Sequence, residues 1–483
     1  MQVLYKEGDE IWIILSETEK VRVGDILNID GIITQIVDIA FANVPGVLEH
    51  LLRKSLIPAS KVAQEIQPEV KSVLDTLADK KLAVTKIRGR ILQDGNASIF
   101  RSGIVELPIS RARTQPALMD QGQLFDLLGL QFLNSDTSRT LSSEPQNFDI
   151  MLDRWGINLI TGKKESGKSY FAKKILLRLI RRGIVTIVFD LNSEYVNLWR
   201  SDSEEIQPNE YAQNIRILVP RLQAARDNQV PFNIPLHEIS YDDFAQIVNI
   251  GREQSMYGHL INFWDGHRHQ QFDLNDLEQF ARGIDIQLAR DALLSRIRTA
   301  RALNLFGPGD IRQTIIQLQE RGGGAAVINL SRLNKWERQI IVDVLLRRIT
   351  DLCESSQINP ISLFLEEAQL YVQPPDKFVD LLTRMRHIGI FPTFITNDPT
   401  TLPDEVFSQL DNLIAFCFKN ENELNHLART GKVDSKTLDV LKNLQPRQFI
   451  AVGSITNEFP IFAEGTPERG VRMGGDTRRL MRH

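Results

Sequence analysis

A glycine- and lysine-rich loop spanning residues 162–169 is the segment whose residue types point most directly to chemistry. Two glycines, a lysine and a hydroxyl residue stand at the spacing of a phosphate-binding P-loop, between an apolar stretch that predicts a strand and a helical pattern. Backbone N–H groups at the helix start would bind phosphates, Lys168 would reach the β- and γ-phosphates, and Ser169 would bind Mg²⁺. The predicted ATP-binding residues are Gly162, Lys163, Lys164, Glu165, Ser166, Gly167, Lys168, Ser169 and Tyr170.

An acidic pair, Glu366 and Glu367, follows the apolar run 361–365. An apolar strand that ends in two carboxylates has the form of a Walker B motif. We expect Glu366 to hold Mg²⁺, directly or through water, and Glu367 to orient and polarise the attacking water. The usual first residue is aspartate, and the longer arm of glutamate favours a water-mediated metal contact. A solvated strand end is the structural alternative.

Three polar residues after the acidic pair complete the predicted site. Asn397 ends the run 394–397 and is placed to sense a γ-phosphate, although a simple strand-ending asparagine fits equally well. Arg384 and Arg386 are separated by one residue and cannot share a helix face. One of them would cross a subunit interface as an arginine finger. We favour Arg386, with Arg384 as the alternative, and a surface helix end competes with both.

A further acidic group, Asp190 and Glu194, follows the apolar run 184–189. The carboxyl ends of the strands are where ligands bind in an open parallel sheet. These two carboxylates would therefore orient water or Mg²⁺ from behind the site. Capping of a helix by Asp190 or Ser193 is an equally good interpretation.

The elements that must position these residues indicate an α/β core with a parallel sheet. Strands are predicted at 157–160 and 184–189, with a helix from about 169 to 182 between them. Further strands are expected at 325–330, 361–365, 391–396 and 412–418, and residues of about 232–320 form a helical insertion. We expect this core to span residues 149–465.

The N-terminal part reads as a small β-barrel-like domain over residues 1–133. Its short β-branched strands are expected at 11–15, 21–29, 31–37 and 82–87, and a helical pattern at about 44–80 interrupts them. A polar linker follows at 134–148, and an exposed tail rich in arginine and glycine occupies 466–483.

Composition excludes several classes of protein. The 483 residues carry 57 lysines and arginines against 61 acidic residues, a net charge of −4, which excludes a histone-like polycation. Two cysteines are too few for a disulfide framework or a cysteine zinc site. No apolar run approaches the ~18 residues of a membrane span, and the N-terminus lacks the pattern of a signal peptide. We expect a cytoplasmic protein without a membrane segment.

The order of these motifs resembles the HerA family, within the HerA–FtsK group of P-loop motors. Three departures are Glu-Glu-Ala-Gln at 366–369 for the family's Asp-Glu-Ala-His, Asn397 for a glutamine, and Arg386-His387 for an Arg-Lys pair. The matching segments are Val21-Arg22-Val23-Gly24-Asp25, the P-loop, Phe189-Asp190 with Glu194-Tyr195, Pro231 to Leu236, the acidic pair, Asn397-Asp398-Pro399 and Ser408 to Asn412.

The resemblance implies a hexameric ATP-driven DNA translocase or helicase. Such a protein would have a RecA-like core, an N-terminal barrel of the HAS-barrel type, and ATP bound between subunits. It would act on double-stranded DNA with a NurA-type nuclease or another effector protein, in DNA end processing and repair or in anti-phage defence. The C-terminal tail would brace a neighbouring subunit.

Two other functions remain open at this point. A nucleotide-dependent ring could assemble and activate an effector as a scaffold, with little translocation. A conjugation-type motor ATPase would share the same core. The DNA-contacting residues are not evident from the pattern, and the candidates are Trp264 with Arg268 and Arg332 with Lys335.

Overall fold

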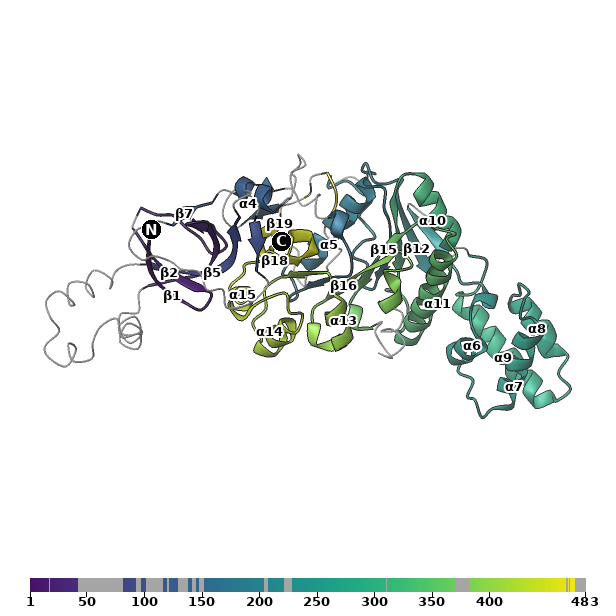
Figure 1. Cartoon of the computed structure of the whole chain (residues 1–483). Coiled ribbons are helices and arrows are strands. Elements are labelled where there is room, and N and C mark those ends of the chain that lie inside the picture. Colours follow the sequence, from purple (N-terminus) through teal and green to yellow (C-terminus); the bar gives the residue numbers. More distant parts are fainter. Residues whose placement is uncertain are drawn as a thin grey trace, which may run out of the picture. The chain divides into compact units, whose positions relative to one another are not determined.

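The computed structural model divides the chain into two compact units (Figure 1). The first combines Met1–Trp155 with Asn412–Thr466, and the second combines Gly156–Asp411 with Pro467–His483. The helical stretch predicted at about 44–80 lies outside the described residues. The structure describes residues 1–16, 18–41, 81–92, 97–100, 116–119, 121–128, 138–140, 145–146, 152–203, 207–220, 228–309, 311–370, 382–465, 468 and 470–473.

The N-terminal residues of the first unit form an antiparallel sheet. Apolar and polar residues alternate along its strands, so that side chains such as Ile11, Ile13 and Leu15 bury one face in a common core. A two-residue turn at Asp30-Gly31, with both φ angles positive, joins two of the strands. The strand order is β1-β2-β5-β4-β3-β7, with β6 on β5. The strands are β1 Gln2–Glu7, β2 Glu10–Leu15, β3 Ile26–Ile29, β4 Ile32–Phe41, β5 Lys81–Ile91, β6 Ala97–Ile99 and β7 Ala117–Leu118.

A C-terminal segment completes the first unit, which differs from the predicted domain boundaries. Residues 412–465 were expected in the ATPase core, and the residues of β8 and β9 in a linker. The structure pairs β17-β18-β19-β8-β9 in antiparallel order. The elements are β17 Asn412–Ala415, β18 Gln448–Gly453, β19 Ile461–Gly465, β8 Ser138–Thr140, β9 Pro145–Gln146, α4 Gln121–Leu127, α14 Glu421–Ala428 and α15 Ser435–Leu441.

A buried arginine explains why these two distant parts of the chain cluster together. The side chain of Arg88 on β5 is 6% exposed. Its guanidinium donates to Gln35 Oε1 at 3.0 Å, to Asp434 Oδ2 at 2.6 Å and to Thr437 Oγ1 at 2.6 Å. A buried guanidinium requires such partners, and the C-terminal segment supplies two of the three.

The second unit contains a parallel sheet, as the sequence predicted. Its strands run in the order β13-β12-β14-β11-β15-β16-β10, and each neighbouring pair is parallel. Helices α5 and α10 pack on this sheet, and the side chains of β11, β14 and β15 are buried throughout. The elements are β10 Asn158–Thr161, α5 Lys168–Arg181, β11 Val185–Asp190, β12 Ile215–Pro220, β13 Gln229–Phe232, β14 Gly324–Asn329, β15 Ile361–Glu366 and β16 Ile390–Thr396.

Helices occupy most of the range for which an insertion was predicted. They are α6 Tyr241–Ile247, α7 Ser255–Gly266, α8 Leu274–Arg282, α9 Gln287–Leu303 and α10 Ile311–Glu320. Buried Phe244, Phe263 and Leu293 form part of the core between α6, α7 and α9, whereas α10 contacts β14. The next helix, α11, spans Lys335–Glu354. None of the helices in the described ranges has the length and apolarity of a membrane span.

The described part of the C-terminal tail packs onto its own unit, although an exposed tail was expected. Glu468 forms ion pairs with Arg178 and Arg181 of α5. Val471 and Met473 are buried. The carboxylate and the two apolar side chains give residue 468 and residues 470–473 partners within the same chain, which accounts for their packing.

Candidate nucleotide-binding site

The predicted P-loop connects β10 to α5. Gly162 and Gly167 have φ angles of 155° and 113°, which favour glycine. Gly167 is the N-cap of α5, and no side chain caps the first turn. The free N–H groups at this helix start are therefore available to an anion.

A cavity of about 300 Å³ brings the P-loop together with the ends of three strands. The acidic pair after β15 and Asn397 after β16 line it, together with residues that follow β11. The sequence motifs thus converge on one edge of the sheet, because all these strands are parallel. The lining residues are Lys164, Glu165, Gly167, Lys168, Ser169, Tyr170, Asn192, Glu194, Glu366, Glu367, Ile395, Thr396 and Asn397.

Lys168 is the buried cation of this cavity. Its side chain donates to the carbonyl oxygen of Lys163 at 2.7 Å. Burial lowers the pKa of Lys168 to about 8, while the carboxylates of Glu366, Glu367 and Glu194 act in the opposite direction. A bound triphosphate would offer this ammonium a charged acceptor in place of a neutral carbonyl.

One side chain of the P-loop, that of Ser166, lacks a hydrogen-bond partner among the described residues. Its hydroxyl is buried. Leaving a buried donor unsatisfied costs about 1–3 kcal/mol. A phosphate oxygen bound in the loop would satisfy it, so the P-loop fits the nucleotide that its sequence predicts.

Glu366 is buried at the end of β15 and is held by a tyrosine. The hydroxyl of Tyr195 donates to Glu366 Oε1 at 2.6 Å. Burial, together with the nearby carboxylates of Glu194 and Asp190, raises the pKa of Glu366 to about 8. Among the described residues this carboxylate forms no ion pair, and it would gain a directly bound cation if Mg²⁺ were bound with the phosphates of a nucleotide.

Asp190 supports the turn that carries Tyr195. Its two carboxylate oxygens accept the backbone N–H groups of Glu194 and Tyr195, each at 2.9 Å. Burial raises the pKa of Asp190 to about 6. Of the two roles that the sequence left open, these bonds favour the structural one for Asp190. Glu194 instead lines the cavity, and its Oε2 lies 3.4 Å from the ammonium of Lys173.

Glu367 is fixed by two side-chain amides. Asn397 Nδ2 donates to its Oε1 and Gln369 Nε2 to its Oε2, both at 2.8 Å. Gln369 in turn accepts the hydroxyl of Thr396 at 2.9 Å. Glu367 has a φ angle of 53°, an unusual conformation for a residue with a side chain. The two amides orient the carboxylate at the cavity wall without neutralising it.

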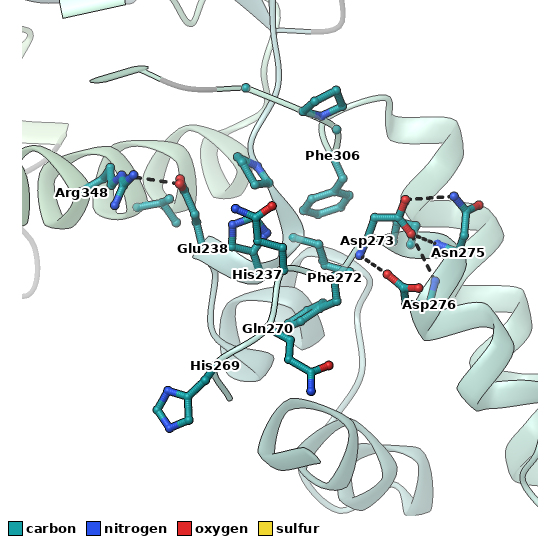
Figure 2. Close-up of a pocket in the computed structure, with 18 of the residues that line it drawn as sticks. His237, Glu238, His269, Gln270, Phe272, Asp273, Asn275, Asp276, Phe306 and Arg348 are labelled. Carbon is teal, nitrogen blue, oxygen red and sulfur yellow. Dashed lines mark hydrogen bonds and ion pairs between the residues drawn. The ribbon is translucent and has the colours of Figure 1, made fainter. Parts of the chain in front are cut away.

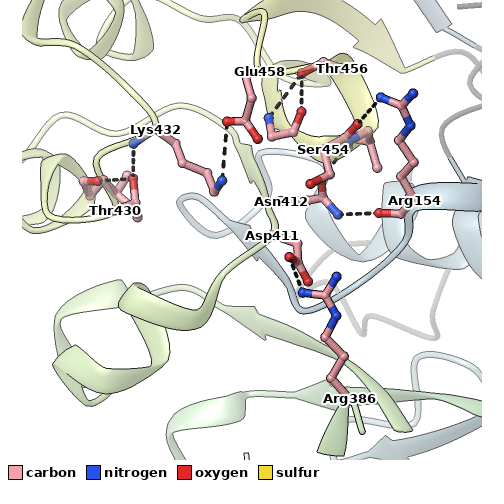
Figure 3. Close-up of polar contacts among 12 residues, drawn as sticks. Arg154, Arg386, Asp411, Asn412, Thr430, Lys432, Ser454, Thr456 and Glu458 are labelled. Carbon is pink, nitrogen blue, oxygen red and sulfur yellow. Dashed lines mark hydrogen bonds and ion pairs between the residues drawn. The ribbon is translucent and has the colours of Figure 1, made fainter. Parts of the chain in front are cut away.

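The two candidate arginine fingers do not line this cavity. Arg386 is 61% exposed and lies 3.1 Å from Asp411, as Figure 3 shows. Arg384 forms an ion pair with Glu354. Neither arginine therefore lines the nucleotide cavity of its own chain, so a role in phosphate binding would require a second subunit.

Comparison with a known family decides which group of proteins this site belongs to. Residues 158–349 match the family model described as the central domain of helicase HerA. Over these residues, the chain is similar to the HerA central domain. The resemblance predicted from the motifs is confirmed, and with it the assignment of the chain to the P-loop ATPases. No curated protein matches the chain.

Solved structures with low similarity to this chain include three kinds of protein. VirB4 of Thermoanaerobacter pseudethanolicus is 13% identical, with 70% of this chain and 99% of that chain covered and a TM-score of 0.47. The bacterial conjugative coupling protein TrwBdeltaN70 is 13% identical over 71% and 96%, with a TM-score of 0.44. The genome packaging NTPase B204 from Sulfolobus turreted icosahedral virus 2 is 15% identical over 65% and 98%, with a TM-score of 0.33.

Mg²⁺ would depend on the nucleotide in this HerA-type core. Within the described ranges, no cluster of three or more His, Cys, Asp or Glu side chains could hold a metal ion alone. Ser169 and Glu366 both line the small cavity. They supply a hydroxyl and a carboxylate, the oxygen ligands that Mg²⁺ takes together with phosphates and water.

A larger cavity of about 1,390 Å³ lies where the helical insertion meets α11 (Figure 2). Several of its charged side chains already have partners. Arg348 pairs with Glu238 at 3.5 Å, and Arg301 pairs with Glu278 at 2.7 Å. Asp273 caps α8 by accepting two backbone N–H groups. This cavity also lacks the P-loop and the acidic pair, so volume alone does not make it a candidate for the ATPase reaction.

Proposed function

We propose that the chain is the subunit of a hexameric, ATP-driven translocase that acts on double-stranded DNA. The observation that carries this proposal is the convergence of Lys168, Glu366, Glu367 and Asn397 on one small cavity behind the P-loop. The similarity of residues 158–349 to the HerA central domain supports it. In this proposal the second unit is a RecA-like core, and the N-terminal sheet belongs to a barrel of the HAS-barrel type.

The proposed mechanism assigns one task to each group. Lys168 leaves the Lys163 carbonyl and contacts the β- and γ-phosphates. Ser169 and Glu366 would hold Mg²⁺, which would offset the negative charge of the phosphates. Glu367, oriented by Asn397, accepts a hydrogen bond from the attacking water and aligns it with the γ-phosphate. Asn397 is placed to detect the γ-phosphate because it bonds to Glu367 at the cavity edge.

Arg386 would complete the site in a ring. An exposed guanidinium offered to the neighbouring subunit's γ-phosphate would stabilise the charge of the transition state. Mixed rings test this role, with Arg384 as the alternative. Lys168→Ala and Arg386→Ala subunits, each inactive alone, should regain part of the activity when mixed, because one supplies the arginine that the other lacks. No recovery in mixed rings would remove Arg386 from the site.

The decisive experiment combines mass photometry with an ATPase assay, with and without duplex DNA. We expect a six-membered ring whose hydrolysis requires Lys168 and rises with DNA. Arg301→Ala, in the larger cavity, is the matched control and should behave as the unchanged protein. A ring whose hydrolysis ignores DNA would instead support the scaffold, and a monomer in all conditions would contradict the intersubunit site.

The partner of this motor is proposed to be a NurA-type nuclease or another effector protein, in DNA end processing or anti-phage defence. A scaffold that only assembles such an effector predicts that function in cells survives Glu367→Gln. The translocase predicts that function is lost while the ring remains intact. A conjugation-type motor would share the nucleotide site, but its hydrolysis would respond to a different substrate.

A further inference from the structure

An exposed tryptophan lies close in sequence to two exposed cations at the start of α11. Trp336 is 70% exposed. Arg332 and Lys335 are exposed as well, and their side chains have no ion pair or hydrogen bond with any of the described residues. The acidic neighbour Glu337 is buried in the capping box of α11, where it accepts the backbone N–H of Asn334 at 2.9 Å. The surface formed by Arg332, Lys335 and Trp336, here called the Trp336 patch, is therefore positively charged.

The other pair considered for DNA contact is occupied within the fold. The indole N–H of Trp264 donates to the carbonyl oxygen of Ile239 at 2.9 Å, and its ring packs against Phe244 and Phe263. Arg268 pairs with Asp265 at 3.1 Å. Trp264 is thus part of the core of the insertion, and only the Trp336 patch presents a free indole beside free cations among these candidates.

The chemistry of the Trp336 patch fits a strand with accessible bases. Arginine and lysine bind phosphates, and an exposed indole gains most from stacking on the face of a base. In duplex DNA these faces already stack on one another, whereas in a single strand they are open. An exposed large aromatic side chain among cations is therefore better matched to single-stranded than to duplex DNA.

Hydrogen bonds connect the Trp336 patch to the nucleotide cavity. The hydroxyl of Ser193 lies 2.8 Å from Ser331 Oγ and 3.2 Å from Asn329 Oδ1, just before the patch. Ser193 stands between Asn192 and Glu194, which both line the cavity. The backbone N–H of Leu330 also donates to the carbonyl oxygen of Asp190 at 2.8 Å. A shift of the 192–194 segment would thus be transmitted to the loop that carries the patch.

We propose that the Trp336 patch binds single-stranded DNA and that Ser193 links this binding to the occupancy of the nucleotide cavity. The proposal rests on the proposed motor function and adds a site for a single-stranded segment beside the duplex, the contacting residues and the link between the two sites. Trp336 stacks on a base, Arg332 and Lys335 bind the flanking phosphates, and Ser193 is a positioning residue.

Binding of a labelled oligodeoxythymidine strand, followed by fluorescence anisotropy over a salt series, tests the contacts. Trp336→Ala should weaken binding about 5- to 150-fold, and Trp336→Phe should retain most of the affinity. Arg332→Ala with Lys335→Ala should reduce the slope of log K against log salt by about 1.4. Leu288→Ala, at a residue 84% exposed on α9, and Arg298→Ala with Lys419→Ala are matched controls that should leave binding unchanged.

The same assay with and without an ATP analogue tests the link. Ser193→Ala should keep the affinity for the strand in the absence of nucleotide but lose the change that the analogue produces. Unchanged binding in the Trp336 and double variants would overturn the proposal, as would failure of the intact protein to bind the strand. A change of oligomeric mass in Trp336→Ala would show that the patch contacts another copy of the chain and would overturn it too.

These outcomes separate the two proposals. If ATP hydrolysis still requires Lys168 and still rises with duplex DNA, but the Trp336 variants bind the strand normally, only the proposal for the Trp336 patch fails. If hydrolysis and its response to DNA are both absent, the motor function itself fails.

Discussion

Two buried carboxylates, one in each compact unit, have opposite surroundings. Glu366 in the second unit is accompanied by the carboxylates of Glu194 and Asp190, and its pKa is raised to about 8, chiefly by burial. Asp434 in the first unit is also largely buried, but the guanidinium of Arg88 and the ammonium of Lys86 hold its pKa well below the usual range. Among the described residues Glu366 forms no ion pair, whereas Asp434 forms two.

The contrast teaches how to distinguish a buried carboxylate with a functional role from one with a structural role. A buried carboxylate with its cations in place stabilises the fold, because its charge is already compensated. A buried carboxylate without one destabilises the fold until a cation arrives with a ligand. The nucleotide cavity therefore holds charges that the fold alone does not satisfy, as expected of a functional site.

The largest predicted effect comes from removing the uncompensated charge. Glu366→Gln should lower the kcat of ATP hydrolysis by at least about 100-fold, because the proposed ligand of Mg²⁺ is lost. It should also raise the melting temperature, because the buried charge is gone. Steady-state kinetics and calorimetry on the same preparation measure both. Glu320→Gln, at an exposed carboxylate, is the control, and a lower melting temperature in Glu366→Gln would contradict the contrast.

The compensated carboxylate should respond in the opposite way. Asp434→Asn should destabilise the fold by about 3 kcal/mol, because Arg88 would remain buried without its anion. Affinity for nucleotide should stay the same, since Asp434 belongs to the other unit. Denaturant unfolding and nucleotide titration check the two statements. Asp439→Asn, a more exposed carboxylate close by in sequence, should change stability by less than about 0.5 kcal/mol.

The two acids should also give opposite dependences of stability on pH. The folded-state pKa of Glu366 is raised, so the folded chain binds more protons and stability falls as pH rises from about 4.5 to about 8. The folded-state pKa of Asp434 is lowered, so its contribution is present above about pH 4 and is lost as pH falls below that value. The difference in melting temperature between Glu366→Gln and the unchanged protein should therefore grow between about pH 5 and pH 8. A constant difference would exclude the raised pKa.

The smallest predicted effect concerns the hydroxyl that holds Glu366. Tyr195→Phe removes a single hydrogen bond, worth about 1–3 kcal/mol when the acceptor is charged. Because this bond favours the ionised form of Glu366, its loss should raise the pKa of Glu366 further and shift the pH profile of Mg²⁺-dependent hydrolysis to higher pH. An unchanged profile would mean that Tyr195 only fills space.

The motifs of the nucleotide site could be predicted from sequence because each is local. The P-loop, the acidic pair and Asn397 each end a strand, and a parallel sheet brings strand ends together. Tyr195 and Gln369 were not predicted as parts of the site. The role of Tyr195 depends on a hydrogen bond to Glu366, which lies 171 residues away in the sequence. The role of Gln369 depends on the unusual φ angle of Glu367. A tyrosine five residues after a strand-ending aspartate was the one available signal.

The fold was predictable to a similar degree. The strands of apolar, β-branched residues were recognised, but β12 and β13 were not. Pro220 ends the first and Pro231 lies within the second, and proline argues against a strand unless it lies at an edge. The membership of 412–466 in the first unit could not be predicted, because it depends on the partners of one buried arginine.

The shared use of Arg88 by two distant parts of the chain has a consequence for synthesis. The strands of the first unit leave the ribosome early, but Asp434 and Thr437, which satisfy Arg88, follow more than 300 residues later. The second unit is encoded almost entirely between them. The ATPase unit can therefore begin to fold during translation, while the N-terminal unit waits for the last part of the chain.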